Sequence, residues 1–318
     1  MHLPTLAHTA GGSAVKRRSS SLRRQEAIHG LLLVSPWIAG LFIFFIGPII
    51  ASFYLSLTDY NVLKPPVFIG IQNYVTALTT DHLFPIAIER TVYYVVLTVP
   101  TVILGSLGLA LLLNRGVPGT NFFRTMFFMP SLVPVVASAV LWVWVFQPQV
   151  GLFNYLLGQV GIRGPAWLGD PSTALPSLAM ITLWGTVGGT TMIIFLAGLQ
   201  SVPQEMYDAA AIDGAGNWRK FLNVTLPLIS PTMLFNLVLG IISAFQVFSI
   251  TYVATQGGPA YATWFYVYYL YQQGFNFYHM GYASAMAWIF LVIVLCFTYL
   301  QVRWSQSWVY YEGEEHAE

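Results

Sequence analysis

The chain has 318 residues, of which 56% are hydrophobic and only 8% are charged. Because a soluble domain carries about 25% charged residues, this composition excludes an ordinary soluble protein and indicates an all-α, polytopic membrane protein. The net charge of +1 gives no indication of a nucleic-acid partner, and the single cysteine, Cys296, cannot form an internal disulfide or a cysteine metal site.

The N-terminal segment combines a basic stretch with a long apolar run. Five Lys and Arg residues lie between Lys16 and Arg24, and the apolar run extends from Leu31 to about Leu57. The run is longer than the about 7–15 residues of a signal-peptide core. We therefore expect residues 1–30 to form a cytoplasmic tail and the run to form the first membrane span.

The positions of the charged residues divide the rest of the chain. Asp, Glu, Lys and Arg are all missing from residues 27–58, 91–114, 125–162, 171–204 and 221–302. A span needs about 20 apolar residues. The sequence predicts a six-helix transmembrane domain over 31–303, followed by a C-terminal cytoplasmic tail over 304–318. The predicted spans lie near 31–57, 91–113, 123–146, 175–199, 228–252 and 282–302. The aromatic stretch from Trp264 to Tyr271 is either an interfacial helix or an early start of the sixth span.

The distribution of Lys and Arg predicts the orientation of these spans. Ten of the 13 lie in the two termini and the loops on their side of the membrane, and three lie on the other side: Lys64, Arg90 and Arg163. The side that is rich in Lys and Arg is normally cytoplasmic. We therefore expect a multi-pass protein of the cell membrane, in contact with lipid, with both termini in the cytoplasm.

The missing charges also bear on mechanism. An ion-coupled secondary transporter usually carries ionisable groups in mid-span, and this chain has no mid-span carboxylate or basic residue. It has no H-E-x-x-H motif and no G-x-x-x-x-G-K-[ST] motif for phosphate binding. We therefore predict no catalytic residues, no metal site and no cofactor in this chain, so that a transporter of this kind must take its energy from another subunit.

Residues 201–227 form the most informative loop. Ser201 with Gln204 is typical of a capping box that opens a short helix, and Gly214 is placed to end that helix. Asn217 is expected to cap a second short helix before Leu226 and Pro227 start the next span. The pattern predicts two short helices along the membrane surface, either as a docking site for another protein or as an ordinary linker.

The loop resembles a known family signature. Asp208-Ala209-Ala210, three residues, Gly214, nine residues and Val224-Thr225-Leu226-Pro227 follow the E-A-A…G…I-x-L-P pattern of permeases in binding-protein-dependent ABC importers. Over nearly the whole chain, the sequence is similar to the larger subunit of maltose-type sugar permeases, in which Phe122-Phe123-Arg124, the Leu196–Pro203 segment and Gly257-Gly258-Pro259 also match.

The resemblance implies the type I ABC importer permease fold and a set of partners. These are a second homologous permease, a dimer of ATPase subunits that binds ATP and Mg²⁺, and an extracytoplasmic sugar-binding protein. It also implies that the loop helices dock on the ATPase. The residues expected at that contact are Glu205, Asp208, Ala209, Ala210, Asp213 and Gly214.

A sugar site needs aromatic faces and uncharged hydrogen-bonding groups. The fifth span offers Phe245, Gln246, Phe248, Ser249 and Tyr252, and the fourth offers Trp184, Thr186, Thr190 and Thr191. The resemblance implies that these spans line the cavity, although aromatic residues at helical spacing are also typical of plain packing. We expect alternating-access import of a di- or oligosaccharide. The alternatives are glycerol 3-phosphate or another polyol-like solute, and, in another class, an ion-coupled carrier.

Overall fold

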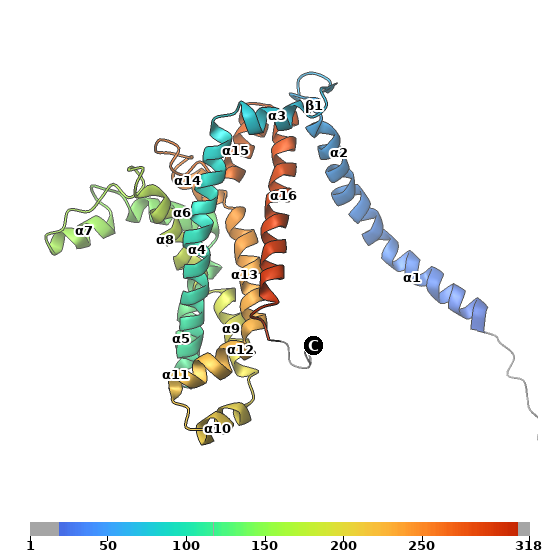
Figure 1. Ribbon diagram of the computed structural model, residues 1–318. Coiled ribbons are helices and arrows are strands. Elements are labelled where there is room, and N and C mark those ends of the chain that lie inside the picture. The colour runs from blue at the N-terminus through green and yellow to red at the C-terminus, as the bar shows by residue number, and fades with distance from the viewer. Residues whose placement is uncertain (1–18, 117, 311–318) are drawn as a thin grey trace, which may run out of the picture. The chain divides into compact units, whose positions relative to one another are not determined.

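A computed structural model describes residues 19–116 and 118–310, and it divides the chain into two compact units at Tyr54 (Figure 1). The first unit carries α1 (Ser19–Leu41), a π-helical turn (Phe42–Ile46) and most of α2 (Gly47–Ser56). Together Arg24–Ser56 form a helix of 33 residues that is long and apolar enough to cross a membrane. The predicted first span is therefore present and begins earlier than expected. The π-turn ends two residues before Pro48, which has no N–H to donate to the helix.

The second unit is organised around α4 (Leu83–Leu113), a helix of 31 residues. Its buried side chains recur at helical spacing, as in Val95, Val99, Ile103 and Leu107. The stripe packs against α8 (Ala174–Thr186), α9 (Thr190–Gln200) and α13 (Ser230–Phe245) (Figure 1). This arrangement places the core between α4 and the fourth and fifth predicted spans.

The third and fourth predicted spans are bent rather than continuous. The third consists of α5 (Thr120–Phe128), a 3₁₀ turn (Met129–Leu132) and α6 (Val135–Val145), with a bend of 94°. Pro134 sets this break, since it lacks an N–H and takes an extended conformation before α6. The fourth bends by 50° between α8 and α9 at Gly188 and Gly189.

A close backbone approach explains the glycine at the second bend. A Cβ on Gly188 would lie 2.1 Å from the carbonyl oxygen of Phe127 in α5. The two bent segments therefore touch where each of them breaks. The described residues contain four continuous helices long and apolar enough to cross a membrane, and six spans result if each bent pair crosses once.

The fifth and sixth spans follow a connection with its own helix. α13 is followed by the short α14 (Ser249–Ala254), and α16 (Met280–Ser305) forms the sixth span. α15 (Tyr266–Tyr271) continues as a π-turn (Gln272–Asn276) and packs against α4 and α16. The aromatic stretch is therefore a separate helix, and the sixth span begins only at Met280.

Smaller elements complete the second unit. β1 (Thr58–Asp59) pairs antiparallel with β2 (Val67–Phe68), with Thr58 opposite Phe68. The side chain of Asn73 in α3 (Gln72–Thr79) donates to the carbonyl of Thr58 at 2.9 Å. The remaining helices are α7 (Leu152–Gln159), α10 (Gln204–Ile212), α11 (Asn217–Lys220), a π-turn (Phe221–Thr225) and α12 (Leu226–Leu228).

Asp81 holds the start of α4. One carboxylate oxygen accepts the backbone N–H groups of Leu83 at 2.9 Å and Phe84 at 3.2 Å. The other accepts the phenol hydroxyls of Tyr269 in α15 and Tyr282 in α16, each at 2.5 Å. Burial, with a further contribution from Asp81, raises the pKa of Tyr269 above its usual range, so this phenol stays protonated and donates. One carboxylate thus joins three helices.

Candidate substrate cavity and coupling surface

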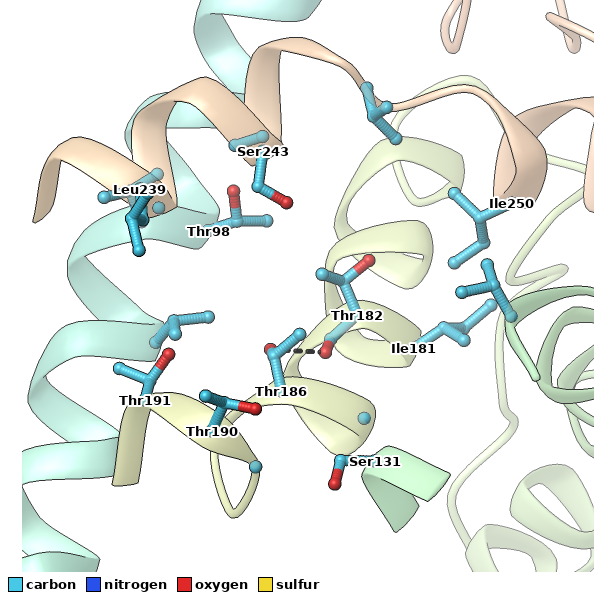
Figure 2. Close-up of a pocket in the computed structure, with 18 of the residues that line it drawn as sticks. Thr98, Ser131, Ile181, Thr182, Thr186, Thr190, Thr191, Leu239, Ser243 and Ile250 are labelled. Carbon is cyan, nitrogen blue, oxygen red and sulfur yellow. Dashed lines mark hydrogen bonds between the residues drawn. The ribbon is translucent and has the colours of Figure 1, made fainter. Parts of the chain in front are cut away.

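A cavity of about 590 Å³ lies between α4, α6, α8, α9 and α13, beside the two bends (Figure 2). The side chains that surround it in Figure 2 come from segments far apart in the chain: Thr98 from α4, Ser131 from the 3₁₀ turn, Thr182 from α8 and Ser243 from α13. Helix packing rather than a local motif therefore builds the site.

The cavity wall is largely apolar surface, and the hydrogen-bonding groups set into it are uncharged. Its described lining contains no Asp, Glu, Lys, Arg or His. The hydrogen-bonding side chains in the lining are those of Tyr94, Thr98, Ser131, Ser138, Thr182, Thr186, Thr190, Thr191, Asn236, Ser243, Gln246 and Ser249. Hydroxyl and amide groups can donate and accept, so the wall is suited to a neutral solute with many hydroxyl groups.

Local hydrogen bonds orient several of these hydroxyls. Thr186 Oγ1 donates to the carbonyl of Thr182 at 2.6 Å, which is the dashed contact in Figure 2. Thr98 Oγ1 donates to the carbonyl of Tyr94 at 2.7 Å, and the Tyr94 hydroxyl lies 2.6 Å from Thr182 Oγ1. A hydroxyl that donates to the backbone keeps lone pairs that accept, so these groups present acceptors to a solute.

Two helix interruptions reach the cavity. One is the Gly188–Gly189 break between α8 and α9, and Gly189 itself lies in the lining. The other follows Phe245, where α13 ends and Gln246 takes its C-terminal cap position. In a membrane protein, irregular backbone is tolerated where it lines a cavity or is buried in protein. Both helix breaks are therefore explained by their position at the cavity.

The cavity brings together most of the predicted substrate residues. Thr186, Thr190, Gln246, Phe248 and Ser249 all line it, as does Thr191. Their roles as substrate contacts remain predictions.

Three predicted residues lie outside the lining. Phe245 is 2% exposed and packs against Phe290 and Phe297, so the structure places it in the core instead of the site. Trp184 packs edge-on against Trp142, with ring centroids 5.8 Å apart. Both are aromatic residues at helical spacing, which the sequence does not separate from cavity residues.

Tyr252, the third, belongs to an aromatic cluster that adjoins the cavity. It stacks on Phe248 at 5.5 Å, and Tyr271 stacks on Phe275 at 5.3 Å. The two stacked pairs meet where Tyr252 and Tyr271 lie 5.4 Å apart at an interplanar angle of 81°. Phe248 belongs both to this aromatic cluster and to the cavity lining, so the cluster adjoins the cavity wall.

Sequence reasoning missed several lining residues. Asn236 carries the same signal as Gln246, a polar amide inside an apolar span, and could have been found by the same criterion. Thr98, Thr182 and Ser243 gave no such signal, because Ser and Thr are common in membrane helices and often bond to their own backbone.

The predicted loop helices are present, but their N-terminal caps differ from expectation. α10 begins at Gln204 with Pro203 in the cap position, and the Ser201 hydroxyl donates to the carbonyl of Gly198 instead, at 2.8 Å. The predicted capping box is therefore wrong, because Ser201 caps the C-terminal end of α9 and the extended Pro203 takes the N-cap position of α10. Likewise Asn217 is the first residue of α11, and Gly216 takes the cap position.

Gly214 ends α10 as predicted. Its φ of +75° lies in the left-handed region that favours glycine. The Gly214 N–H donates to the carbonyl of Ala211 at 3.0 Å, and the Ala215 N–H donates to that of Ala210 at 2.9 Å. These two bonds form a Schellman motif, which fixes the turn between the two loop helices.

The loop presents its predicted contact residues to the surface. Glu205, Asp208, Ala209, Asp213 and Gly214 are exposed, and Ala210 is half-buried. The loop also exposes two large apolar side chains that were not among the predicted contact residues, Ile212 at 87% exposure and Trp218 at 70%. The Tyr207 hydroxyl lies 3.0 Å from Thr225 Oγ1 and holds α10 against the start of the fifth span.

Comparison with known proteins identifies the family. Residues 103–309 match the family described as the binding-protein-dependent transport system inner membrane component. The chain is 38% identical over 311 residues to the probable ABC transporter permease protein YesP of Bacillus subtilis, covering 96% of this chain and 99% of that protein. It is 34% identical to the trehalose/maltose transport system permease protein MalF of Thermococcus litoralis, covering 90% and 96% of the two chains.

A solved structure agrees with these matches. The crystal structure of a bacterial ABC transporter involved in the import of the acidic polysaccharide alginate contains a chain that superposes with a TM-score of 0.78. The match covers 90% of this chain and 97% of that chain, at 25% identity. The type I permease fold expected from the sequence is therefore confirmed, and the chain belongs to the inner-membrane components of binding-protein-dependent transport systems.

Proposed function

We propose that this chain is one of two permease subunits of an ATP-driven importer that translocates a neutral di- or oligosaccharide. The observation that carries the proposal is the cavity of about 590 Å³, whose described lining is rich in hydroxyl and amide groups and free of charged side chains. A cavity of this size lies within the usual range of ligand sites, about 300–1,000 Å³.

The chemistry of the wall favours a neutral saccharide over glycerol 3-phosphate. A phosphate requires a fixed cation or a set of aimed N–H donors to replace its hydration, and the described lining offers no Lys, Arg or His. A saccharide needs hydroxyl partners and aromatic surface, which the wall and the cluster around Phe248 and Tyr252 supply.

The proposed mechanism is alternating access with no covalent chemistry in this chain. An extracytoplasmic binding protein delivers the saccharide, and an ATPase dimer, which binds ATP and Mg²⁺, pushes on α10 and α11 from the cytoplasmic side. The Lys and Arg distribution supports that orientation, with both termini inside. The exposed contact residues of the loop, from Glu205 to Gly214, support the docking.

The test uses the complete importer in proteoliposomes with its binding protein. Uptake is measured for maltose, trehalose, maltotriose and glycerol 3-phosphate, together with the ATP hydrolysis that each stimulates. We expect a saccharide and not glycerol 3-phosphate to be transported. Gln246→Ala should lower saccharide uptake, whereas Gln159→Ala on the exposed surface of α7 should leave it unchanged. Uptake of glycerol 3-phosphate alone would overturn the proposal.

A further inference from the structure

Asn236 carries a buried side-chain amide in the cavity wall, and the N–H donor of this amide is unsatisfied in the described part of the chain. It lies in the middle of α13, it is 4% exposed and it belongs to the cavity lining. Within the described part of the chain, its Nδ2 has no hydrogen-bond partner. A buried donor without an acceptor destabilises a fold. A leucine would fill similar space without that cost, so the amide calls for an explanation.

The neighbours of Asn236 on α13 show which face of the helix it shares with other cavity-lining residues. Gly240 and Ser243 follow at spacings of four and three residues, so the three positions share one face of the helix, and all of them line the cavity. A Cβ on Gly240 would have only ordinary contact with Val99, at 3.6 Å. The described neighbours therefore leave room for a side chain at position 240, and the glycine there means that no side chain stands between Asn236 and Ser243 on this face of α13.

We infer that Asn236 donates a hydrogen bond to a hydroxyl oxygen of the saccharide, in a subsite distinct from the one around Gln246. This inference rests on the proposed function. The two amides are ten residues apart, which is about 15 Å along a helix. That separation exceeds the length of one sugar ring. Asn236 lies closer along α13 to the loop helices than Gln246 does, because the N-terminal end of α13 is connected to them through the π-turn and α12 (Figure 1). The saccharide therefore meets Asn236 on the part of its path nearest the ATPase.

A matched pair of variants separates this role from a merely structural one. Gln301 in α16 is also buried, at 9% exposure, and neither its Nε2 nor its Oε1 has a partner among the described residues, but it lies outside the cavity lining. Replacing either amide by leucine removes an uncompensated polar group. Both Asn236→Leu and Gln301→Leu should therefore leave the melting temperature of the complete importer unchanged or higher.

Only Asn236→Leu should impair transport. With the best-transported saccharide of the panel, we expect uptake and saccharide-stimulated ATP hydrolysis to fall about five- to tenfold, equivalent to about 1–1.4 kcal/mol at 1.4 kcal/mol per tenfold. Asn236→Ser, which keeps a donor, should retain more activity than Asn236→Leu. Gln301→Leu should transport at the wild-type rate.

Two results would overturn the inference. In the first, Asn236→Leu transports as well as Gln301→Leu. In the second, Asn236→Leu lowers the melting temperature or prevents co-purification of the second permease, since the amide would then bond to that subunit. Either result leaves the proposed function standing if Gln246→Ala still lowers saccharide uptake. If the wild-type importer takes up no saccharide, the proposed function itself fails.

Discussion

Gly214 provides the sharpest test of the proposed docking of the loop helices on the ATPase. Replacing it by valine should abolish uptake while the protein still accumulates in the membrane. The reason is the backbone: its φ of +75° is costly for any residue with a Cβ and most costly for a β-branched one. No atom lies within 4 Å of where the Cβ would be, so the described chain itself presents no steric obstacle.

The magnitude follows from that geometry. A left-handed conformation costs a residue with a side chain about 1–2 kcal/mol, and β-branching raises the figure. This is small against a total stability of about 5–15 kcal/mol, so the fold should survive. It is comparable with the combined contribution of the two bonds of the Schellman motif, each of which is worth about 1 kcal/mol net. The end of α10 should therefore fray, and the turn that sets the two loop helices should lose its shape.

The assay compares substitutions at two nearby glycines, only one of which has a positive φ. Gly216 lies two residues away and is equally exposed, but its φ is −71°. Gly216→Ala should therefore retain uptake and saccharide-stimulated ATP hydrolysis in the complete importer. Gly214→Ala should lower both, and Gly214→Asn should retain most activity, because asparagine tolerates the left-handed region.

The reasoning would be refuted by either of two results. Normal uptake by Gly214→Val would show that the turn is not needed for coupling. Equal loss in Gly214→Asn and Gly214→Val would show that a close contact with the partner excludes any side chain, so that backbone strain is not the cause.

Three further predictions concern the rest of the second unit. Gly188→Ala should reduce the yield of folded complex by gel filtration, because its Cβ would meet the Phe127 carbonyl at 2.1 Å, whereas Gly185→Ala, which meets nothing within 4 Å, should fold normally. Asp81→Ala should lower stability by about 2 kcal/mol in thermal unfolding, since α4 loses its cap and two phenols lose their acceptor, while replacement of the exposed Asp59 of β1 by alanine serves as the control. Tyr271→Leu should weaken saccharide uptake more than Tyr271→Phe, which keeps the ring stacked on Phe275, and equal effects would argue against an aromatic contact with the sugar.

Much of the fold could be predicted from charge-free apolar runs, because hydrocarbon leaves no alternative to helices that satisfy their own backbone. The spans near 91–113 and 282–302 appear in the structure as α4 and α16. The bends could not be placed in the same way. Pro130 and Pro134 indicate a break in the third span, but its angle of 94° depends on what packs around it. The break at Gly188 depends on a contact with Phe127, about 60 residues away in sequence.

The candidate site likewise combines features that neighbouring residues in the sequence determine with features that tertiary packing determines. Gly214 and the two loop helices follow from local rules, since a helix end is decided within a few residues. The capping-box prediction at Ser201 failed because the same residue closes α9, and the letters alone do not show that α9 continues as far as Gln200. Whether a residue lines the cavity depends on which side of its helix faces the cavity, and tertiary packing decides this. Phe245 and Gln246 are adjacent, yet one is packed in the core and the other lines the cavity.

The helix α9 connects the cavity with the loop that carries α10. Its first residues, Thr190 and Thr191, line the cavity, and its last, Gln200, leads into the loop that carries α10. Between them, Gly198 lets α9 approach α13 closely, since a Cβ there would lie 2.8 Å from Thr232 Oγ1. A packed helix pair moves as a unit and not by continuous deformation. We therefore expect motion that starts at the loop to reach the parts of the cavity wall that α9 and α13 form, and we expect the break at Gly188 and Gly189 to let α9 turn relative to α8.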